Sequence, residues 1–280
     1  MLSFDLPYFD QIIERLEGDP DSVLAEAFRR HVHWGCFEDP AGADDSLGSY
    51  MAAAENLTRR ISGAGRTGEG TAVLDVGCGF GGTIAHLNET LEGRELTGLN
   101  IDGRQLARAR ELVRAVSGNT VDFVEGDACE LPFEDARFDV VLAVECIFHF
   151  PSRKQFFREA ARVLRPGGRL ALSDFVLAPG ALEPYVAWTK SGEISESEFY
   201  GTNKVPVTSA AYERVARGSG LEVLLDEDIT PNTLPTYPAM RRLYREAGLP
   251  DGEQATTFLE EVARRGWVQY RILSFAKPAG

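Results

Sequence analysis

Between residues 72 and 175, short aliphatic runs alternate with segments of helical periodicity. The runs AVLDVG, ELTGLNI, VDFVEG, FDVVLAV and RLALSDF are rich in β-branched and aliphatic residues, as strands are. Helical patterns over about 82–91, 104–116 and 153–164 separate them. Strands joined by crossover helices predict a parallel, doubly wound sheet, so the chain belongs to the α/β class.

The segments on either side of this alternation have other patterns. Apolar residues at helical spacing before residue 61 predict a helical cap, and the glycine-rich stretch SGAGRTGEGT over 62–71 predicts a flexible joint. The irregular, aromatic segment 178–206 is typical of a lid, and two later strand patterns bring the expected sheet to seven strands. We expect a single domain over 1–280, divided into a cap at 1–61, a core at 70–177, and a lid plus the last two strands at 178–280.

The charge and cysteine content limit the partners and the compartment. The chain has 29 basic and 43 acidic residues, a net charge of −14, which repels nucleic acids and anionic membranes. Its four cysteines form no C-x-x-C pair, and the N-terminus lacks the basic and apolar regions of a signal peptide. No apolar run approaches the ~20 residues of a membrane-spanning helix. These features predict a cytoplasmic protein with no nucleic-acid or membrane partner.

A glycine-rich loop follows the first predicted strand. Residues 77–82, GCGFGG, fit the dinucleotide pattern G-x-G-x-x-G, with Gly77 and Gly79 allowing close backbone approach to a ligand. Asp75 lies two positions earlier, and a carboxylate repels a pyrophosphate about 4 Å away by roughly 1 kcal/mol in water and about 4 kcal/mol at an effective dielectric near 20. A carboxylate suits an ammonium instead. Asp75 and bare loop N–H groups together match the zwitterion of S-adenosylmethionine (SAM), whereas the glycines alone also suit NAD(P).

The stretch VLDVGCGFGG resembles the first motif of class I SAM-dependent methyltransferases, specifically over residues 70–180. HVHWGCFEDP, DITPNTLPTYPAM and YRILSFAKP are similar to segments of the sugar and polyketide O-methyltransferases of antibiotic biosynthesis. The resemblance implies a Rossmann-like fold of seven strands, SAM as cofactor, S-adenosylhomocysteine (SAH) as product, and a small-molecule acceptor.

The resemblance also implies cofactor-binding residues. Asn100 stands where the family usually keeps an acidic residue for the ribose hydroxyls, and Gln105 matches a glutamine that binds ribose in such cases. In EGDACELPF, Asp127 would accept from the adenine amino group, and the Ala128 N–H would donate to the ring. Trp34, in an aromatic-glycine turn, would lie over the cofactor. The plainer alternatives are an exposed helix position for Gln105, a turn for Asp127 and a core anchor for Trp34.

Two residues near strand ends are candidates for the chemistry. Alignment alone recovers roughly 7–11 kcal/mol of the barrier to methyl transfer, and a protonated hydroxyl also needs a base. His149 follows the fourth strand and Asp174 ends the fifth, at the edge where such sheets bind ligands. The resemblance implies His149 as general base and Asp174 as its support, with Phe148 where some relatives have a second histidine. Packing is the alternative for His149, and a solvated loop start for Asp174. Glu145 is expected to line the cofactor pocket, with proton uptake as its alternative.

Several functions are disfavoured or stay open. His31, His33 and Cys36 have metal-like spacing, but on the expected helix residues i and i+2 point apart, so no metal is predicted there. Carboxylates near Asp174 leave a magnesium site open. The lack of an N/D-P-P-Y/F tetrapeptide argues against amine methylation of DNA or glutamine. We expect O-methylation of a natural-product intermediate and leave a homo-oligomer open. The alternatives are a C- or N-methyltransferase acting by proximity, an NAD(P)-binding oxidoreductase and a non-catalytic SAM-binding protein.

Overall fold

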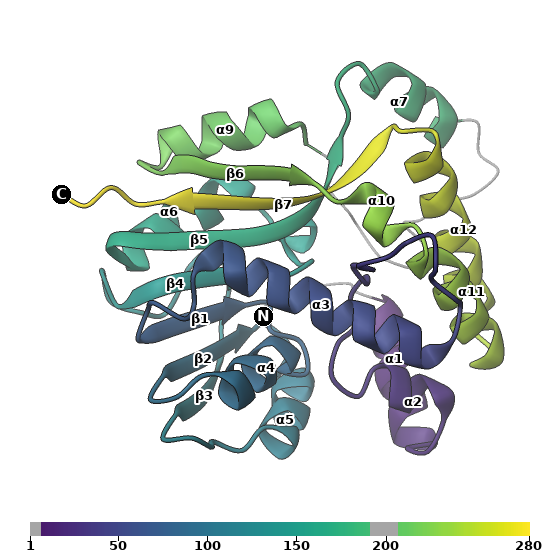
Figure 1. The fold of residues 1–280 in the computed structure, drawn as a ribbon, viewed down its shortest axis with the longest axis horizontal. Coiled ribbons are helices and arrows are strands. Elements are labelled where there is room, and N and C mark those ends of the chain that lie inside the picture. Colours follow the sequence, from purple (N-terminus) through teal and green to yellow (C-terminus); the bar gives the residue numbers. More distant parts are fainter. Residues whose placement is uncertain (1–6, 191–206) are drawn as a thin grey trace.

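The computed structural model describes residues 7–190 and 207–280, with a seven-stranded sheet at its centre (Figure 1). The strands are β1 (Ala72–Val76), β2 (Glu95–Asn100), β3 (Thr120–Glu125), β4 (Phe138–Ala143), β5 (Leu164–Leu177), β6 (Glu222–Asp228) and β7 (Val268–Ala276). Their order is β3-β2-β1-β4-β5-β7-β6, parallel from β3 to β5 and antiparallel where β7 pairs with β5 and β6. The predicted α/β class and the mostly parallel, Rossmann-like sheet are confirmed.

Helices cover both faces of the sheet (Figure 1). One face carries α3 (Leu47–Gly65), α4 (Gly82–Thr90) and α5 (Gly103–Leu112), and the other carries α6 (Arg153–Val163) and α9 (Ser209–Gly218). Strand β4 shows why both faces need a cover. Its Val140 and Leu142 join the buried cluster that contains Ile61 of α3, whereas Val141 joins the cluster around Phe157 of α6. A strand buried on both sides is the reason for its continuous apolar sequence.

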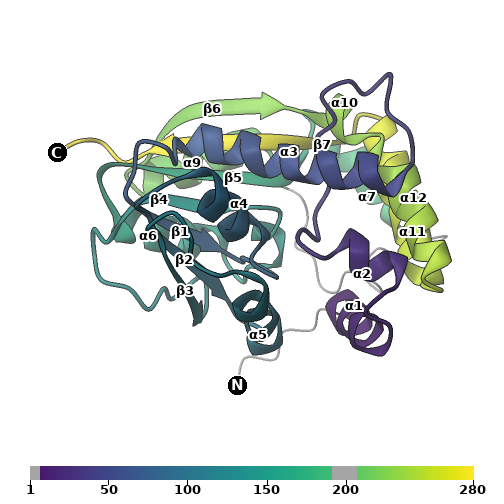
Figure 2. The same cartoon turned by 60° about the horizontal axis from the view of Figure 1, so that its bottom comes forward.

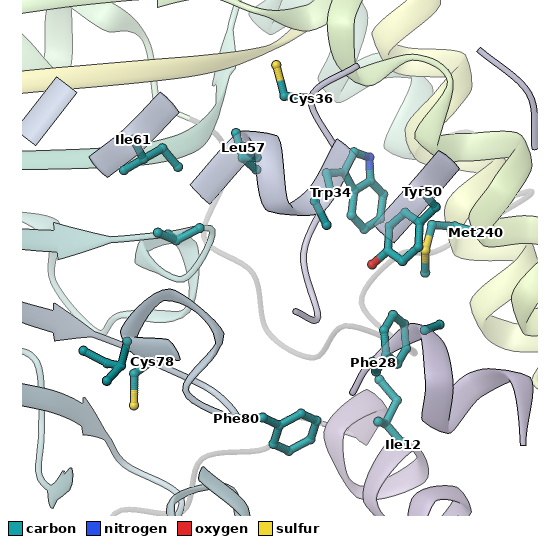
Figure 3. Close-up of a cluster of buried hydrophobic side chains, with 14 of the residues drawn as sticks. Ile12, Phe28, Trp34, Cys36, Tyr50, Leu57, Ile61, Cys78, Phe80 and Met240 are labelled. Carbon is teal, nitrogen blue, oxygen red and sulfur yellow. The ribbon is translucent and has the colours of Figure 1, made fainter. Parts of the chain in front are cut away.

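Further helices gather beyond the carboxyl ends of the parallel strands (Figures 1 and 2). They are α1 (Pro7–Gly18), α2 (Val23–Ala27), α7 (Leu182–Lys190), α10 (Thr230–Thr233), α11 (Thr236–Glu246) and α12 (Pro250–Arg264). Phe28, Trp34, Tyr50 and Met240 come from different parts of this layer and from α3, and they belong to one buried cluster (Figure 3). The N-terminal helices and the late helices therefore pack together over the ligand edge of the sheet. In the described part of the chain, no helix is both long and apolar enough to cross a membrane.

Three local predictions are wrong. The expected joint over 62–71 is helical as far as Gly65, because α3 packs so closely on the sheet that a Cβ at Gly65 would lie 3.0 Å from Leu142. Helix α5 ends at Leu112, before the expected 116. Helix α7 lies inside the segment that lacked a clear pattern, and the rest of that expected lid, 191–206, lies outside the described residues. The division into cap, core and lid of one domain stays a prediction.

Candidate active site

The glycine loop connects β1 to α4 in a conformation that depends on glycine. Gly77 and Gly79 have φ of 72° and 55°, in the left-handed region. A Cβ on Gly77 would lie 2.7 Å from the Cβ and Sγ of Cys146. At Gly79 the nearest atom to a Cβ would be Gln105 Oε1, at 3.8 Å, and both residues line one pocket. We call this the cofactor pocket, and Gly79 presents bare backbone to it.

The loop offers fewer N–H groups than expected. The N–H groups of Gly77 and Cys78 both donate to the Leu99 carbonyl, at 2.7 Å and 3.0 Å, and that of Gly81 donates to Cys78. Within the described residues, Gly79 and Phe80 are the loop positions whose N–H groups have no backbone acceptor. The expectation of N–H groups free for a ligand therefore applies to Gly79 and Phe80 and not to the whole loop. The first two N–H groups hold β1 against β2 instead.

Asp75 is a buried carboxylate at the carboxyl end of β1. It is 1% exposed, and neither oxygen makes a hydrogen bond of normal geometry within the described part of the chain. Burial raises its pKa to about 8, against a lowering by the Thr83 hydroxyl. A cationic ligand group in the cofactor pocket, which Asp75 lines, would satisfy this carboxylate.

Asn100 and Gln105 meet at the end of β2. The Asn100 amide donates to Gln105 Oε1 at 3.0 Å, and both side chains are buried and line the cofactor pocket. Gln105 is therefore not the exposed helix position of the alternative. The neighbouring Asp102 caps α5 by accepting from the Arg104 N–H. The Gln105 side chain also hydrogen-bonds the Asp102 carboxylate, so the protein holds this amide in place at the pocket wall.

Asp127 and Ala128 lie past the end of β3 and also line the cofactor pocket. Asp127 Oδ1 accepts from the Cys129 N–H at 2.7 Å, which is the turn geometry of the alternative. The other carboxylate oxygen and the Ala128 N–H make no hydrogen bond to the protein within the described ranges. The turn and a role toward an adenine amino group are therefore compatible.

A second cavity adjoins the cofactor pocket, and we call it the acceptor pocket. Its wall is mostly apolar and aromatic and also contains His33, Glu145 and Arg153. The other residues of the wall are Tyr8, Phe28, Val32, Trp34, Tyr50, Phe148, Phe175, Tyr185, Met240, Tyr244, Leu259, Val262 and Val268. Both pockets are lined by Tyr8, Val32, His33 and Glu145. Ligands in the two pockets would therefore meet at these four residues.

Trp34 lines the acceptor pocket and is absent from the wall of the cofactor pocket. Its ring packs edge-on against Phe175 and Tyr237, and its N–H on the backbone donates to Glu145 Oε2 at 2.9 Å. Trp34 therefore faces the acceptor pocket, and its place over the cofactor stays a prediction. The Trp34–Gly35 turn is held against α11, because the Gly35 N–H donates to Thr236 Oγ1 at 3.0 Å.

His149 ends the short 3₁₀ helix η1 (Ile147–His149) and lines the cofactor pocket. Its Nε2 is 3.1 Å from the Tyr8 hydroxyl, and its buried Nδ1 makes no hydrogen bond in the described part of the chain. Its ring stacks on Tyr8 and meets Phe148 edge-on. Burial, reinforced by the Arg153 cation, lowers its pKa to about 3, so the imidazole is neutral near pH 7.

Asp174 does not support His149. It is fully buried, and its Oδ2 accepts from Arg153 Nη2 at 3.0 Å and from the Tyr212 hydroxyl. Its Oδ1 accepts from the Phe175 N–H. Burial raises the pKa of Asp174, against a lowering by Arg153. Both the expected pair with His149 and the solvated alternative are wrong, because α6 and α9 bring a cation and a phenol to this carboxylate.

Glu145 lies where the two pockets meet. It has a φ of 48°, which is unusual for a residue with a side chain and is found at strained functional positions. Its Oε2 accepts from the Trp34 N–H and from the Tyr270 hydroxyl. Burial raises its pKa to about 8, against a lowering by Tyr270. Glu145 lines both the cofactor pocket and the acceptor pocket, and its role toward the cofactor stays a prediction.

The two histidines of HVHWG are not on a helix, because α2 ends at Ala27. His33 Nε2 and His31 Nδ1 are 3.1 Å apart, so the argument that these side chains point apart is wrong. Their other hydrogen-bond partners are the Trp34 carbonyl, the Thr58 hydroxyl and the Glu55 carboxylate. In the described ranges, no three His, Cys, Asp or Glu side chains are grouped as a metal site requires.

Sequence reasoning missed Tyr8 and Arg153, which form part of the acceptor wall. Arg153 carried a signal. It is the first residue of α6, and a cation is unfavourable at a helix N-terminus, so this arginine needed another reason to be there. Tyr8 precedes an apolar helical stripe, and nothing near it in sequence marks its contact with His149.

The cofactor pocket fits SAM. In the described part of the chain, the Asp75 oxygens make no hydrogen bond of normal geometry and could meet an ammonium, and Gly79 and Phe80 offer N–H groups. Gln105 of α5 and Asp127, just past β3, line the pocket where the nucleoside would lie. When bound, SAM supplies a sulfonium methyl group for transfer.

Comparison with known proteins assigns the class. Residues 74–172 match a family described as a methyltransferase domain. The chain therefore belongs to the class I SAM-dependent methyltransferases that act on small molecules, as its relatives also show. This membership removes the oxidoreductase alternative.

Particular relatives cover most of the chain. The methyltransferase GfsG of Streptomyces halstedii is 32% identical over 97% of this chain and 93% of its own length. The 27-O-demethylrifamycin SV methyltransferase of Amycolatopsis mediterranei is 37% identical over 77% of this chain and 75% of its own. The crystal structure of the [4+2]-cyclase SpnF has a TM-score of 0.72 and 23% identity, covering 98% of this chain and 94% of its own. The last likeness shows the fold alone.

Proposed function

We propose that the chain transfers a methyl group from SAM to a hydroxyl group of a small natural-product acceptor. The relative from Amycolatopsis mediterranei is named for transfer to oxygen, which supports a hydroxyl. The aromatic wall of the acceptor pocket suits an apolar or ring-containing molecule. The observation that carries the proposal is the Tyr8–His149 pair, which joins a base in the cofactor pocket to a residue shared by both pockets.

We further propose His149 as the general base. When its Nε2–H donates to the Tyr8 oxygen, Nδ1 has the free lone pair and has no competing donor in the described part of the chain. A neutral imidazole with a pKa of about 3 is a weak base. Transfer of the sulfonium methyl removes a positive charge nearby, and this raises the proton affinity of His149 as the acceptor's proton leaves. Tyr8 takes the orienting role that the sequence suggested for Asp174.

Asp174 then acts as a positioning residue. Its bonds to Arg153 and Tyr212 fix the guanidinium at the acceptor wall, with both charged side chains at most 9% exposed. Because Arg153 and Asp174 together carry no net charge, they offer polar contacts to an acceptor without favouring a charged one. Arg153 Nη1, which makes no hydrogen bond to the protein in the described ranges, is the atom of this pair left for an acceptor oxygen.

Glu145 is a second candidate base. Its Oε2 is held by two donors, and it lines both pockets, so Oε1 is within reach of either ligand. Its pKa of about 8 is closer to neutral than that of His149, which favours proton uptake. The replacement Glu145→Gln keeps the shape and removes this possibility.

A mass-shift screen tests the proposal. Polyketides, deoxysugar glycosides, phenols and amines are incubated with SAM and the enzyme, and each product is searched for one added CH₂. We expect products methylated on oxygen, located by NMR. Products methylated only on nitrogen or carbon would overturn the hydroxyl assignment and favour proximity catalysis. Tight SAH binding without turnover of any acceptor would favour a non-catalytic SAM-binding role.

A further inference from the structure

We propose that Glu145 recognises the positive charge of the SAM sulfonium, and that it thereby distinguishes SAM from the uncharged sulfur of SAH. The inference rests on SAM as the cofactor. It does not depend on the acceptor or on which residue takes the acceptor's proton. It gives Glu145 a part in binding SAM and in releasing SAH.

Glu145 lies where the reacting sulfur has to lie. The methyl group must pass from the cofactor pocket to the acceptor pocket, and these pockets meet at Tyr8, Val32, His33 and Glu145. Of these four residues, Glu145 alone has a carboxylate. Both ring nitrogens of His33 are within hydrogen-bond distance of protein atoms, and burial lowers the pKa of His33 to about 3, so this ring is uncharged near pH 7. The shared wall therefore presents Glu145 as its anionic group.

Glu145 lacks the counter-charge that the nearby Asp174 has. Asp174 accepts from Arg153 Nη2 at 3.0 Å. The donors to Glu145 Oε2 are uncharged, namely the Trp34 N–H and the Tyr270 hydroxyl. Within the described part of the chain, no hydrogen bond reaches Oε1, and no cation is among the groups that shift the pKa of Glu145. A carboxylate removed from water without a cation is costly, so a positively charged ligand group beside Oε1 would stabilise it.

The protein fixes Glu145 through both its backbone and its side chain. The left-handed backbone at φ of 48° is held by the Glu145 N–H, which donates to Ser173 Oγ at 3.0 Å. The same Oγ lies 3.1 Å from the Tyr270 hydroxyl, which donates to Glu145 Oε2. A carboxylate that is oriented before the ligand arrives needs no reorganisation to face a charge. We therefore assign Ser173 on β5 and Tyr270 on β7 positioning roles.

The sulfonium charge is linked to a proton on Glu145. Burial raises the pKa of Glu145 to about 8, reinforced by Asp174 and against a lowering by Tyr270, so the free enzyme holds this proton at pH 7. The pKa values of Tyr270, Tyr237 and Cys146, which Glu145 influences, are all raised, so these groups also stay protonated. A cation favours ionised Glu145, so SAM should expel the proton and SAH should not. The affinity for SAM relative to SAH should therefore rise with pH up to about 8 and stay level above it.

Titration calorimetry at pH 8 without an acceptor tests the inference, because SAM and SAH differ only by the methyl group and the charge on sulfur. We expect Glu145→Gln to weaken SAM by about 10- to 100-fold and SAH by less than about threefold. A neighbouring opposite charge shifts a carboxyl pKa by roughly 1–3, and a difference of one corresponds to a tenfold change in affinity. Tyr270→Phe should give a smaller loss of the same kind. Asp75→Asn is the matched control and should weaken both ligands alike, because both carry the α-ammonium.

Proton release gives a second readout that a structural role would not alter. The titrations are repeated at pH 7 in buffers of different ionisation enthalpy, which counts the protons released on binding. The wild type should release about one proton more with SAM than with SAH. Glu145→Gln should release the same number with both ligands, because the contribution of Asp75 is common to them.

The other outcomes overturn the inference. Equal losses of SAM and SAH in Glu145→Gln would make Glu145 a structural residue, and an unchanged ratio of the two affinities would show that Glu145 does not meet the sulfonium. Equal proton release by the wild type with both ligands would also contradict it, and this result needs no variant to fold. Wild-type protein that binds neither ligand would remove the inference together with the cofactor. Without an acceptor in the assay, failure of the hydroxyl proposal cannot produce any of these results.

Discussion

The cofactor pocket and the acceptor pocket share a wall, but they treat buried polar groups in opposite ways. In the cofactor pocket, the oxygens of Asp75 and Nδ1 of His149 are buried without hydrogen-bond partners in the described residues. In the acceptor pocket, the buried charge of Arg153 is paired with Asp174 and Tyr212. Groups that the fold leaves unsatisfied mark where a ligand completes the structure, whereas satisfied groups hold its shape. Each variant below tests one side of this contrast.

The largest effect is expected at His149. His149→Ala removes the proposed base and should lower kcat by roughly 10²- to 10⁴-fold. The affinity for SAH, measured by calorimetry, should change little, because base catalysis acts in the transition state. Tyr8→Phe keeps the ring and removes the hydroxyl, and we expect a smaller loss of kcat. If His149→Ala kept near-wild-type kcat, the residue would have only a packing role.

The next effect is on stability and concerns Arg153. Arg153→Met leaves Asp174 buried without its cation, which should lower the free energy of unfolding by about 3–5 kcal/mol in urea titrations. The double variant Arg153→Met, Asp174→Asn should recover part of this loss because no uncompensated charge stays behind. A single variant as stable as the wild type would show that the pair is not structural, and the contrast between the pockets would fail.

Asp75→Asn should raise the stability of the ligand-free protein at alkaline pH, whereas Arg153→Met should lower it. The folded pKa of about 8 lies above the ordinary carboxyl value, so ionised Asp75 costs increasing free energy as the pH rises from about 4 to 8. The ligand-free variant should therefore melt at a higher temperature than the wild type at pH 8, with little difference at pH 4. SAH binding should weaken by about 10- to 100-fold through loss of the ammonium partner. Destabilisation at pH 8, or full affinity for SAH, would count against Asp75 as a ligand group.

The smallest effect is expected at Trp34. Trp34→Phe trims the acceptor wall, and we expect the acceptor KM to rise a few-fold, equivalent to about 1 kcal/mol. The SAH dissociation constant should stay constant. A variant that loses SAH affinity while keeping the acceptor KM would show that Trp34 contacts the cofactor, as the family resemblance implies.

Much of the cofactor pocket could be predicted because it depends on local sequence. Asp75, Gly77 and Gly79 lie within five positions, and a strand followed by a glycine turn fixes their geometry. Asn100 and Gln105 are close in sequence and bond to each other. Here the backbone path is enough to bring the groups together.

The partners of His149 and Asp174 could not be predicted in the same way. Both residues lie at the predicted sheet edge, but their side-chain contacts come from Tyr8 on α1 and from Arg153 and Tyr212 on α6 and α9. These helices are placed by the packing of the whole chain, which no short motif encodes.

The conformation of the segment around Trp34 could not be predicted for a related reason. Apolar periodicity continues past the end of α2, yet the chain there is held extended by contacts with distant elements. The Tyr50 hydroxyl donates to the His33 carbonyl at 3.0 Å, and the Gly35 N–H donates to Thr236. Tertiary hydrogen bonds of this kind override a helical pattern, and so the histidines meet and Trp34 turns toward the acceptor pocket.

The pH profile of kcat/KM for the acceptor tests the central claim, that neutral His149 takes the proton. An alcohol acceptor is used at saturating SAM, so that neither the ionisation of the acceptor nor that of Asp75 contributes. With the His149 pKa lowered to about 3, the base form is present throughout, and we predict a flat profile from pH 6 to 9 in both wild type and Glu145→Gln. A rise with a midpoint near pH 8 that disappears in Glu145→Gln would contradict the claim and assign the proton to Glu145.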